Sequence, residues 1–437
     1  MTIRAAVSIL LAVLTLGSIS GCGSGTTDPA VSYHSTATGT GYLRKSDTLW
    51  ILNLEGDYTD MGRQYGALLK NEFPVLFQEM DAAIGFNDTN KVYLTLIAAT
   101  MAERERQFLT GMSQESGLND FDKHEFLNAA LFFMYNPGCS ALAATGPRTE
   151  SGFTIAGRNF DNPRGTGDKY ANLLKGRAIL VIYNPRAQFT GLHRDNSVAM
   201  MSYFGWFHGL TILNEKGIYL EYNNATNSIP MIRADLPTLL LHYRDGLHKN
   251  IYAAFDSDSL DEVDTALSGR VSVANMTQVA DKNQVWHYEH SPYENSENSF
   301  SRKLLAGQAT GRFSYSNTAN TSSFTNHFFS DNWGPHQNLN FSLEHDSASK
   351  TVARLVNLQG LAGSEARITP EMMKNIMTTR LLSNGGGGPF IEWALGNPDV
   401  THFTTVTDIA GKVMHIYPYV DGDAARWTAV DLNGEFR

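Results

Sequence analysis

The fold of this chain is decided by one stretch, Pro137-Gly138-Cys139-Ser140-Ala141-Leu142-Ala143-Ala144. After the cysteine, small and apolar residues follow without interruption, which is typical of a buried β-strand. A second run, Phe153–Asp161, comes after a polar turn at 145–152 and also predicts a strand. Antiparallel pairing of the two strands would bring Cys139, at the start of one, beside Asp161, at the end of the other.

Cys139 has no second core cysteine with which to form a disulfide, because the other cysteine, Cys22, belongs to a targeting segment. Gly138 before it carries no side chain that would obstruct an attack on the Gly138 carbonyl group. These residue types favour self-cleavage between Gly138 and Cys139 through a thioester, which would leave Cys139 with a free α-amine. Such an amine has a pKa of roughly 7.7–8.0 and can act as the general base at neutral pH. The alternative interpretation is a small buried cysteine that ends a core strand.

A resemblance to the N-terminal-nucleophile (Ntn) amide hydrolases is carried by Gly138-Cys139-Ser140 together with Gly157-Arg158-Asn159-Phe160-Asp161. This group includes the choloylglycine (bile salt) hydrolases, relatives of acid ceramidase, and the autoproteolytic acyltransferases typified by the penicillin-biosynthesis enzyme. The resemblance implies an α+β fold, a four-layer αββα sandwich of antiparallel sheets. It also implies that Arg158 favours the thiolate form of Cys139 and that Asp161 accepts a hydrogen bond from the Cys139 amine.

Two asparagines complete the site that the resemblance implies. Asn214-Glu215-Lys216-Gly217 predicts a turn between two strands, and the choloylglycine hydrolases carry the same N-E-K-G turn. Counting from that turn places the family's oxyanion-hole asparagine on Asn224, with Asn223 on the other face of the strand as the alternative. Thr325-Asn326-His327-Phe328 resembles the T-N-H-F of the acyltransferases, so the second active-site asparagine falls on Asn326.

The resemblance leaves one later position open. The choloylglycine hydrolases have an S-R-x-x-R run after the second asparagine, whereas this chain has Ser349-Lys350-Thr351-Val352-Ala353-Arg354. Because lysine cannot make the planar, bidentate contact of arginine, the sequence does not decide whether Lys350 or Arg354 takes that role. His327 is interpreted as structural, because the α-amine already provides the base.

The segment 43–138 is predicted to be a mostly helical pro-segment that becomes the small subunit after cleavage, and 139–437 to be the catalytic domain. Helical patterns cover Phe73–Ile84, Tyr93–Gly111 and Phe121–Tyr135. Between 56 and 66 lies a G-x-x-x-x-M-G-x-Q-x-G pattern, which resembles the opening of the acyltransferase pro-region. Its alternative interpretation is a helix with two closely packed glycines.

Residues 1–22 predict a lipoprotein signal peptide. The apolar run Ala5–Leu16 is short for a membrane span, and Ile19-Ser20-Gly21-Cys22 resembles a bacterial lipoprotein box. In that family the signal is cut before the cysteine and the cysteine is lipidated. The resemblance therefore implies a membrane anchor at Cys22 and a location in the cell envelope, on the periplasmic face of the outer membrane or on the cell surface. The alternative is a plain secretory signal. Residues 23–42, rich in Gly, Ser and Thr, are predicted to be a flexible tether.

Charge and motif content argue against several other classes of function. The formal net charge of −10 argues against a nucleic-acid partner. The chain has no G-x-S-x-G, H-E-x-x-H or C-x-x-C motif. His287 and His290 would point to opposite faces of a strand, so no metal site is expected, and no cofactor is implied.

The function implied by the resemblance is that of a cysteine amidase, which hydrolyses a linear, non-peptide amide bond of an N-acylated small molecule through a thioester. Acyl transfer to an amine shares every step except the last, so it stays open as an alternative. A non-catalytic ligand-binding lipoprotein on the same fold is the alternative of another class. No oligomeric state is predicted.

Overall fold

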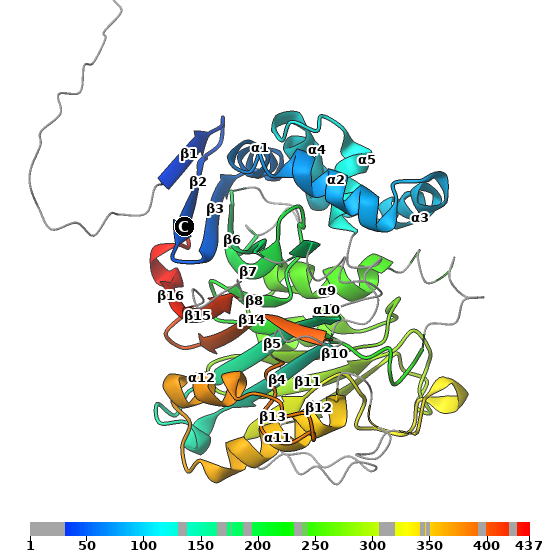
Figure 1. Cartoon of the computed structure of the whole chain (residues 1–437), viewed down its shortest axis with the longest axis vertical. Coiled ribbons are helices and arrows are strands. Elements are labelled where there is room, and N and C mark those ends of the chain that lie inside the picture. Colours follow the sequence, from blue (N-terminus) through cyan, green and yellow to red (C-terminus); the bar gives the residue numbers. More distant parts are fainter. Residues whose placement is uncertain are drawn as a thin grey trace, which may run out of the picture.

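The computed structural model of the chain describes a defined set of residues: 31–129, 138–163, 173–174, 176–186, 195–230, 238, 241, 243–305, 320–340, 346, 350–391, 399–418 and 426–437. Figure 1 shows two stacked sheets at the centre of the molecule, with one group of helices at one end and α11 and α12 at the other. Within these residues, no helix is both long and apolar enough to cross a membrane.

The larger sheet contains ten of the described strands in the order β1-β2-β3-β6-β7-β8-β9-β10-β11-β12. Neighbouring strands are antiparallel except β3 and β6, which run parallel. The bounds are β1 Val31–Ser35, β2 Thr40–Ser46, β3 Leu49–Gly56, β6 Ala178–Pro185, β7 Val198–Tyr203, β8 Thr211–Asn214, β9 Tyr219–Asn224, β10 Asn275–Ala280, β11 Val285–His290 and β12 Ser301–Leu305.

The smaller sheet contains six of the described strands, all antiparallel to their neighbours, in the order β13-β4-β5-β14-β15-β16. Its central hairpin is the one that the sequence predicts. The bounds are β13 Thr321–Phe324, β4 Gly138–Ala144, β5 Ile155–Pro163, β14 Asp399–Asp408, β15 Val413–Pro418 and β16 Thr428–Asp431.

Helices cover the outer faces of both sheets. Two helices, α11 (Thr351–Ser364) and α12 (Pro370–Thr378), pack on β4, β5, β13 and β14 of the smaller sheet. Another helix, α9 (Tyr243–Asp256), packs on β8 and β9 of the larger sheet and carries α10 (Leu260–Leu267). The inner faces meet where β4 lies against β9 and β13 against β11. This order of helix, sheet, sheet and helix confirms the predicted α+β, four-layer αββα sandwich.

Burial on both faces explains the composition of β4. Leu142 and Ala144 belong to a core cluster with residues of α11 and α12, whereas Cys139 and Ala143 belong to the core between the sheets. Successive side chains of a strand point to opposite faces, so a strand that is covered on both sides needs apolar or small residues throughout.

The N-terminal helices are α1 (Tyr58–Leu68), α2 (Phe73–Ile84), α3 (Asp88–Ala98), α4 (Glu103–Glu115) and α5 (Phe121–Asn128). The helix predicted over 73–84 is confirmed. The one predicted over 93–111 is two helices, and at the end of α3 the hydroxyl of Thr100 donates to the carbonyl oxygen of Ile97. The part of the third prediction at 130–135 lies outside the described residues.

The glycine-rich pattern at 56–66 holds α1 against α4 and β3. A Cβ atom on Gly62 would lie 2.0 Å from the carbonyl oxygen of Phe108, so only glycine allows this approach. The side-chain amide of Gln64 donates to the carbonyl oxygen of Glu55 at 2.7 Å and accepts from the Glu55 N–H at 3.0 Å. The glutamine therefore pairs with β3 as a neighbouring strand would.

The prediction of a flexible tether over 23–42 is wrong for its second half. Residues 31–35 and 40–44 form an antiparallel hairpin, closed by a hydrogen bond from the Thr36 N–H to the Gly39 carbonyl oxygen. This hairpin continues the larger sheet through β3, so the sheet stabilises residues whose composition alone favours a linker. The signal peptide, Cys22 and 23–30 lie outside the described residues.

The predicted pro-segment, 43–138, shares its fold with the rest of the chain. Its strand β3 pairs with β6 inside the larger sheet. On α4, Arg104 forms ion pairs with Asp195 at 3.1 Å and with Asp256 at 2.7 Å. The helical content expected there is found from 58 to 128, but the segment is not a separate domain.

Candidate active site

The β4–β5 hairpin brings together the residues that the sequence places at the site. Gly138 lies opposite Asp161, and Cys139 lies opposite Phe160. The Cys139 sulfur is 3.3 Å from Nη2 of Arg158. The side chains of Cys139, Arg158 and Asp161 are buried, with 1%, 0% and 0% of their surface exposed. A guanidinium held this close to a sulfur favours the thiolate by direct charge interaction.

The position of Arg158 is set from the larger sheet. Its Nη2 donates to the carbonyl oxygen of Tyr222 at 2.6 Å, and its Nη1 donates to the hydroxyl of Thr211 at 3.4 Å. Its guanidinium carbon also lies 5.3 Å from the centre of the Phe160 ring. Strands β8 and β9 of the larger sheet therefore position the guanidinium of Arg158, which belongs to β5 of the smaller sheet.

Burial and charge act on the Cys139 thiol in opposite directions. Burial raises the pKa of the thiol to about 11, although the positive charge of Arg158 lowers it. In the uncut chain, desolvation is the larger effect. The thiol is therefore mostly protonated at neutral pH, and its reaction needs the proton to be removed.

A buried ion pair lies close to Cys139. Asp161 pairs with Nη1 of Arg354, and both side chains are fully buried. The hydroxyl of Thr401 donates to the other carboxylate oxygen of Asp161 at 2.6 Å. Burial raises the pKa of Asp161, and the charge of Arg354 opposes this shift. Nη2 of Arg354 also donates to Oδ1 of Asn326 at 3.1 Å, which links the pair to the asparagine.

Asn326 joins the cysteine to the end of β9. The Cys139 N–H donates to Oδ1 of Asn326 at 2.7 Å, and Nδ2 of Asn326 donates to the carbonyl oxygen of Asn224 at 2.7 Å. The Asn326 N–H donates to the hydroxyl of Thr351 at the start of α11. One side chain thus contacts the backbone nitrogen that self-cleavage would convert into an amine.

The two candidate oxyanion donors lie at the end of β9. Oδ1 of Asn224 accepts from the N–H and the hydroxyl of Thr226 at 2.9 and 2.6 Å. Asn223 is buried, and its Nδ2 donates to the carbonyl oxygen of Thr325 at 3.2 Å. Among the described contacts, the Asn224 backbone reaches Asn326, but neither asparagine side chain reaches Cys139.

The choice between Lys350 and Arg354 is made by helix α11. Arg354 faces inward and contacts both Asp161 and Asn326. Lys350 is exposed and occupies the left-handed region, with φ of 52°, directly before the helix. Positions four apart lie on the same side of a helix. Lys350 precedes the first residue of α11, so its side chain does not share the inward face of Arg354.

His327 contacts hydroxyl groups instead of the cysteine. Its Nδ1 lies 3.2 Å from the hydroxyl of Thr325 and 3.1 Å from that of Thr351. Burial, together with the positive charge of Arg354, lowers the pKa of His327 to about 3. The ring is therefore neutral at pH 7 and is a weak base.

Sequence reasoning missed the partners that orient the site residues, such as Thr401, Thr351 and the Tyr222 carbonyl group. No short motif marks them, because each reaches the site through sheet or helix packing. Within the described part of the chain, no group of three or more His, Cys, Asp or Glu side chains could hold a metal ion.

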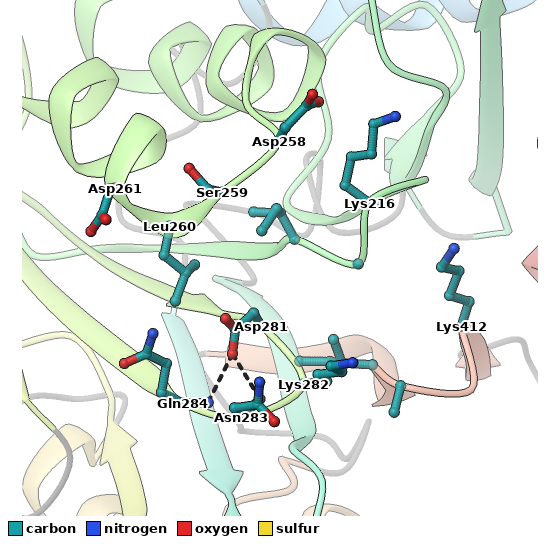
Figure 2. A pocket seen from close by; sticks show the side chains of 14 residues that line it. Lys216, Asp258, Ser259, Leu260, Asp261, Asp281, Lys282, Asn283, Gln284 and Lys412 are labelled. Atoms are coloured by element: carbon teal, nitrogen blue, oxygen red, sulfur yellow. Dashed lines mark hydrogen bonds between the residues drawn. The ribbon is translucent and has the colours of Figure 1, made fainter.

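A cavity of about 470 Å³ lies apart from these residues, between turns of both sheets and the start of α10. Figure 2 shows Lys216, Lys282 and Lys412 around it together with Asp258, Asp261 and Asp281. The three positive and three negative side chains balance, and Asp281 accepts from the N–H groups of its own turn. No site residue named above lines this cavity.

No protein-family model matches the chain, and no curated protein matches it. Among solved structures, it is similar to an N-acylethanolamine-hydrolyzing acid amidase ortholog from Caenorhabditis elegans, with 14% identity and a TM-score of 0.40 over 63% of this chain and 96% of that chain. It is similar to a variant of the conjugated bile acid hydrolase from Clostridium perfringens, with 12% identity and a TM-score of 0.40 over 68% and 93% of the two chains. It is also similar to penicillin V acylase from Agrobacterium tumefaciens, with 9% identity and a TM-score of 0.35 over 68% and 86%.

The chain has an αββα sandwich architecture. That architecture follows from its own two sheets and the helices that cover them.

Proposed function

We propose that this chain is a self-cleaving cysteine amidase, which hydrolyses a linear, non-peptide amide bond of an N-acylated small molecule through a thioester. The observation that carries the proposal is the pair of contacts at Cys139. Its sulfur lies 3.3 Å from Nη2 of Arg158, and its N–H donates to Asn326 at 2.7 Å. A nucleophile beside a cation, with its backbone nitrogen held by a side chain, suits catalysis by the N-terminal amine.

Self-cleavage needs one attack and one hydrolysis. The Cys139 sulfur adds to the carbonyl carbon of Gly138, the bond from that carbon to the Cys139 nitrogen breaks, and the nitrogen takes up the thiol proton. Water then hydrolyses the thioester, which leaves a carboxylate on Gly138 and restores the thiol. The hydrogen bond to Asn326 supports this course, because it keeps the released nitrogen beside the sulfur.

Turnover repeats the same chemistry on a substrate. The α-amine accepts the thiol proton, the sulfur adds to the amide carbonyl carbon, and the substrate's amine departs with that proton. Water then releases the acyl group as an acid. Arg158 stabilises the thiolate, and Asn326 orients the amine. Arg354, which is neutralised by its ion pair with Asp161, holds the Asn326 side chain in place.

We assign the oxyanion donor to Asn224. The bonds from Thr226 engage the oxygen of the Asn224 amide, so the NH₂ group of that amide points the other way and can serve as a donor. A single donor of this kind typically contributes about 2.7–4 kcal/mol to catalysis.

The experiment is a mass measurement on the purified chain, combined with an amidase assay. The wild type should appear as two fragments divided between Gly138 and Cys139, and it should hydrolyse at least one member of a panel of N-acyl amino acids, bile salt conjugates and penicillins. Cys139→Ala should remain whole and inactive. Amidase activity in a chain that stays uncut, or in Cys139→Ala, would contradict the mechanism.

We also propose that the mature chain is lipid-anchored through Cys22 in the cell envelope. The lipoprotein box at 19–22 supports this, and strand β1 begins at Val31. The short intervening segment would keep the catalytic body close to the bilayer. Cys22→Ala should move the protein from the membrane fraction to the soluble fraction, and an unchanged distribution would contradict the anchor.

A further inference from the structure

Among the described residues, the hydroxyl of Tyr203 stands out as a buried polar group without a partner. Tyr203 is the last residue of β7, and none of its surface is exposed. Among the residues that the structure describes, nothing forms a hydrogen bond with its hydroxyl. A buried hydroxyl left unpaired costs about 1–3 kcal/mol, and phenylalanine in its place would avoid that cost.

Two other buried tyrosines differ from Tyr203 in this respect. The hydroxyl of Tyr183, on the adjacent strand β6, donates to the carbonyl oxygen of Phe207 at 3.3 Å. The hydroxyl of Tyr65 accepts from the Gly205 N–H at 3.0 Å. These rings are equally buried, so burial alone does not explain why the Tyr203 hydroxyl has no partner in the described part of the chain.

Tyr203 belongs to the aromatic cluster that surrounds the nucleophile. Its ring centre is 5.8 Å from that of Phe160, the residue opposite Cys139 in the β4–β5 hairpin, and 6.1 Å from that of Phe403. Phe160 and Phe403 stack on each other at 5.3 Å, and the Arg158 guanidinium lies over both rings. The Tyr203 ring and the Arg158 guanidinium therefore pack against the same two phenylalanine rings.

The Tyr203 hydroxyl interacts electrostatically with the charged groups of the site. Burial raises its pKa well above the ordinary value, and the charges of Arg158, Cys139 and Asp161 also act on it. The hydroxyl therefore keeps its proton throughout the working pH range. It is therefore available as a hydrogen-bond donor throughout that range.

We propose that Tyr203 is a catalytic residue whose hydroxyl donates a hydrogen bond to the carbonyl oxygen of the substrate's acyl group as the sulfur adds to it. This inference rests on the proposed amidase function and gives it a second oxyanion donor, beside Asn224. The missing partner of the hydroxyl is then the substrate. No bond to Tyr203 forms or breaks, because the phenol keeps its proton while the negative charge develops.

The test compares Tyr203→Phe with Tyr183→Phe in the full chain, using self-cleavage, kcat, KM and melting temperature. Tyr203→Phe should cut normally, melt at or above the wild-type temperature, and lose about 100-fold in kcat with little change in KM. Tyr183→Phe loses a hydrogen bond inside the core, so it should melt earlier and keep its kcat. A purely structural role for Tyr203 would show the reverse pattern.

Full kcat in Tyr203→Phe, beside an active wild type, would overturn the role of Tyr203 and leave the amidase function standing. A folded Tyr203→Phe chain that fails to cut would also overturn it, because the hydroxyl would then act before any substrate is bound. A wild type that neither cuts nor hydrolyses any amide would overturn the proposed function, and the role of Tyr203 with it.

Discussion

The backbone nitrogen of Cys139 donates its hydrogen to the side-chain oxygen of Asn326 at 2.7 Å, across 187 positions of sequence. The same oxygen accepts from Arg354, so the acceptor is itself fixed in place. A peptide N–H and an amine can both donate to this oxygen. The contact therefore suits the chain before and after the proposed cut, without rearrangement.

Arg354→Met should leave Asp161 as an uncompensated buried charge. Removing one partner of a buried ion pair typically costs about 3–5 kcal/mol, so we expect a large loss in the free energy of unfolding and little self-cleavage. Denaturant midpoints and fragment gels measure the two effects. Lys350→Met, four positions earlier and exposed, is the matched control and should change neither. Equal behaviour of the two variants would show that the pair contributes nothing.

Self-cleavage should accelerate with pH. The attacking species is the thiolate, and the pKa of the Cys139 thiol in the uncut chain is raised to about 11. Below that value the thiolate fraction grows about tenfold for each pH unit, so the cleavage rate should rise steadily between pH 7 and 9. A time course of fragment appearance at several pH values tests this. A rate independent of pH would mean that thiol deprotonation does not limit the cut.

Substitutions of the two asparagines at the end of β9 should affect different properties of the protein. Asn224→Ala removes the proposed oxyanion donor, so kcat should fall by about 10²–10³ with normal cutting. Asn223→Ala removes a hydrogen bond to the Thr325 carbonyl group, which precedes Asn326, so its main effect should be on stability. Steady-state kinetics of both variants separate the roles. A loss of kcat confined to Asn223→Ala would move the donor to the other face of the strand.

The contact between α1 and α4 should not tolerate a methyl group. A Cβ atom on Gly111 would lie 1.9 Å from the carbonyl oxygen of Thr59, so Gly111→Ala must push the helices apart. Overpacking of this kind typically costs about 1–3 kcal/mol. Gly360→Ala in α11 meets nothing within 4 Å and is the control. Its melting temperature should rise slightly, because alanine favours the helix. A Gly111→Ala chain that melts no earlier than the wild type would contradict the close contact.

His290 should make the fold sensitive to mild acid. It is 2% exposed, neither ring nitrogen has a partner among the described residues, and burial lowers its pKa to about 3. The unfolded chain takes up a proton near pH 6.5 that the folded chain does not, so stability falls as the pH drops below 6.5. At pH 5 this linkage amounts to about 2 kcal/mol. His290→Phe should lose less stability between pH 7 and 5, and an identical loss would contradict the assignment.

The sequence by itself determined the features that lie close together along the chain. The hairpin of β4 and β5 sets the distances among Cys139, Arg158 and Asp161, because the two strands are neighbours in the chain, joined by residues 145–154. The N-E-K-G turn between β8 and β9 is local in the same way, and it placed Asn224 at a strand end. Alternating or continuous apolar residues were enough to indicate these strands and the mixed α+β class.

Only the tertiary structure decided which distant groups complete the site. The choice of Arg354 over Lys350, the hydroxyl of Thr401 and the carbonyl oxygen of Tyr222 each depend on how α11, β14 and β9 pack around the hairpin. The strands at 31–46, expected to belong in part to a tether, exist because β3 offers them a sheet edge. Local composition does not encode such contacts, since they arise from pairing and burial between segments that are far apart in the chain.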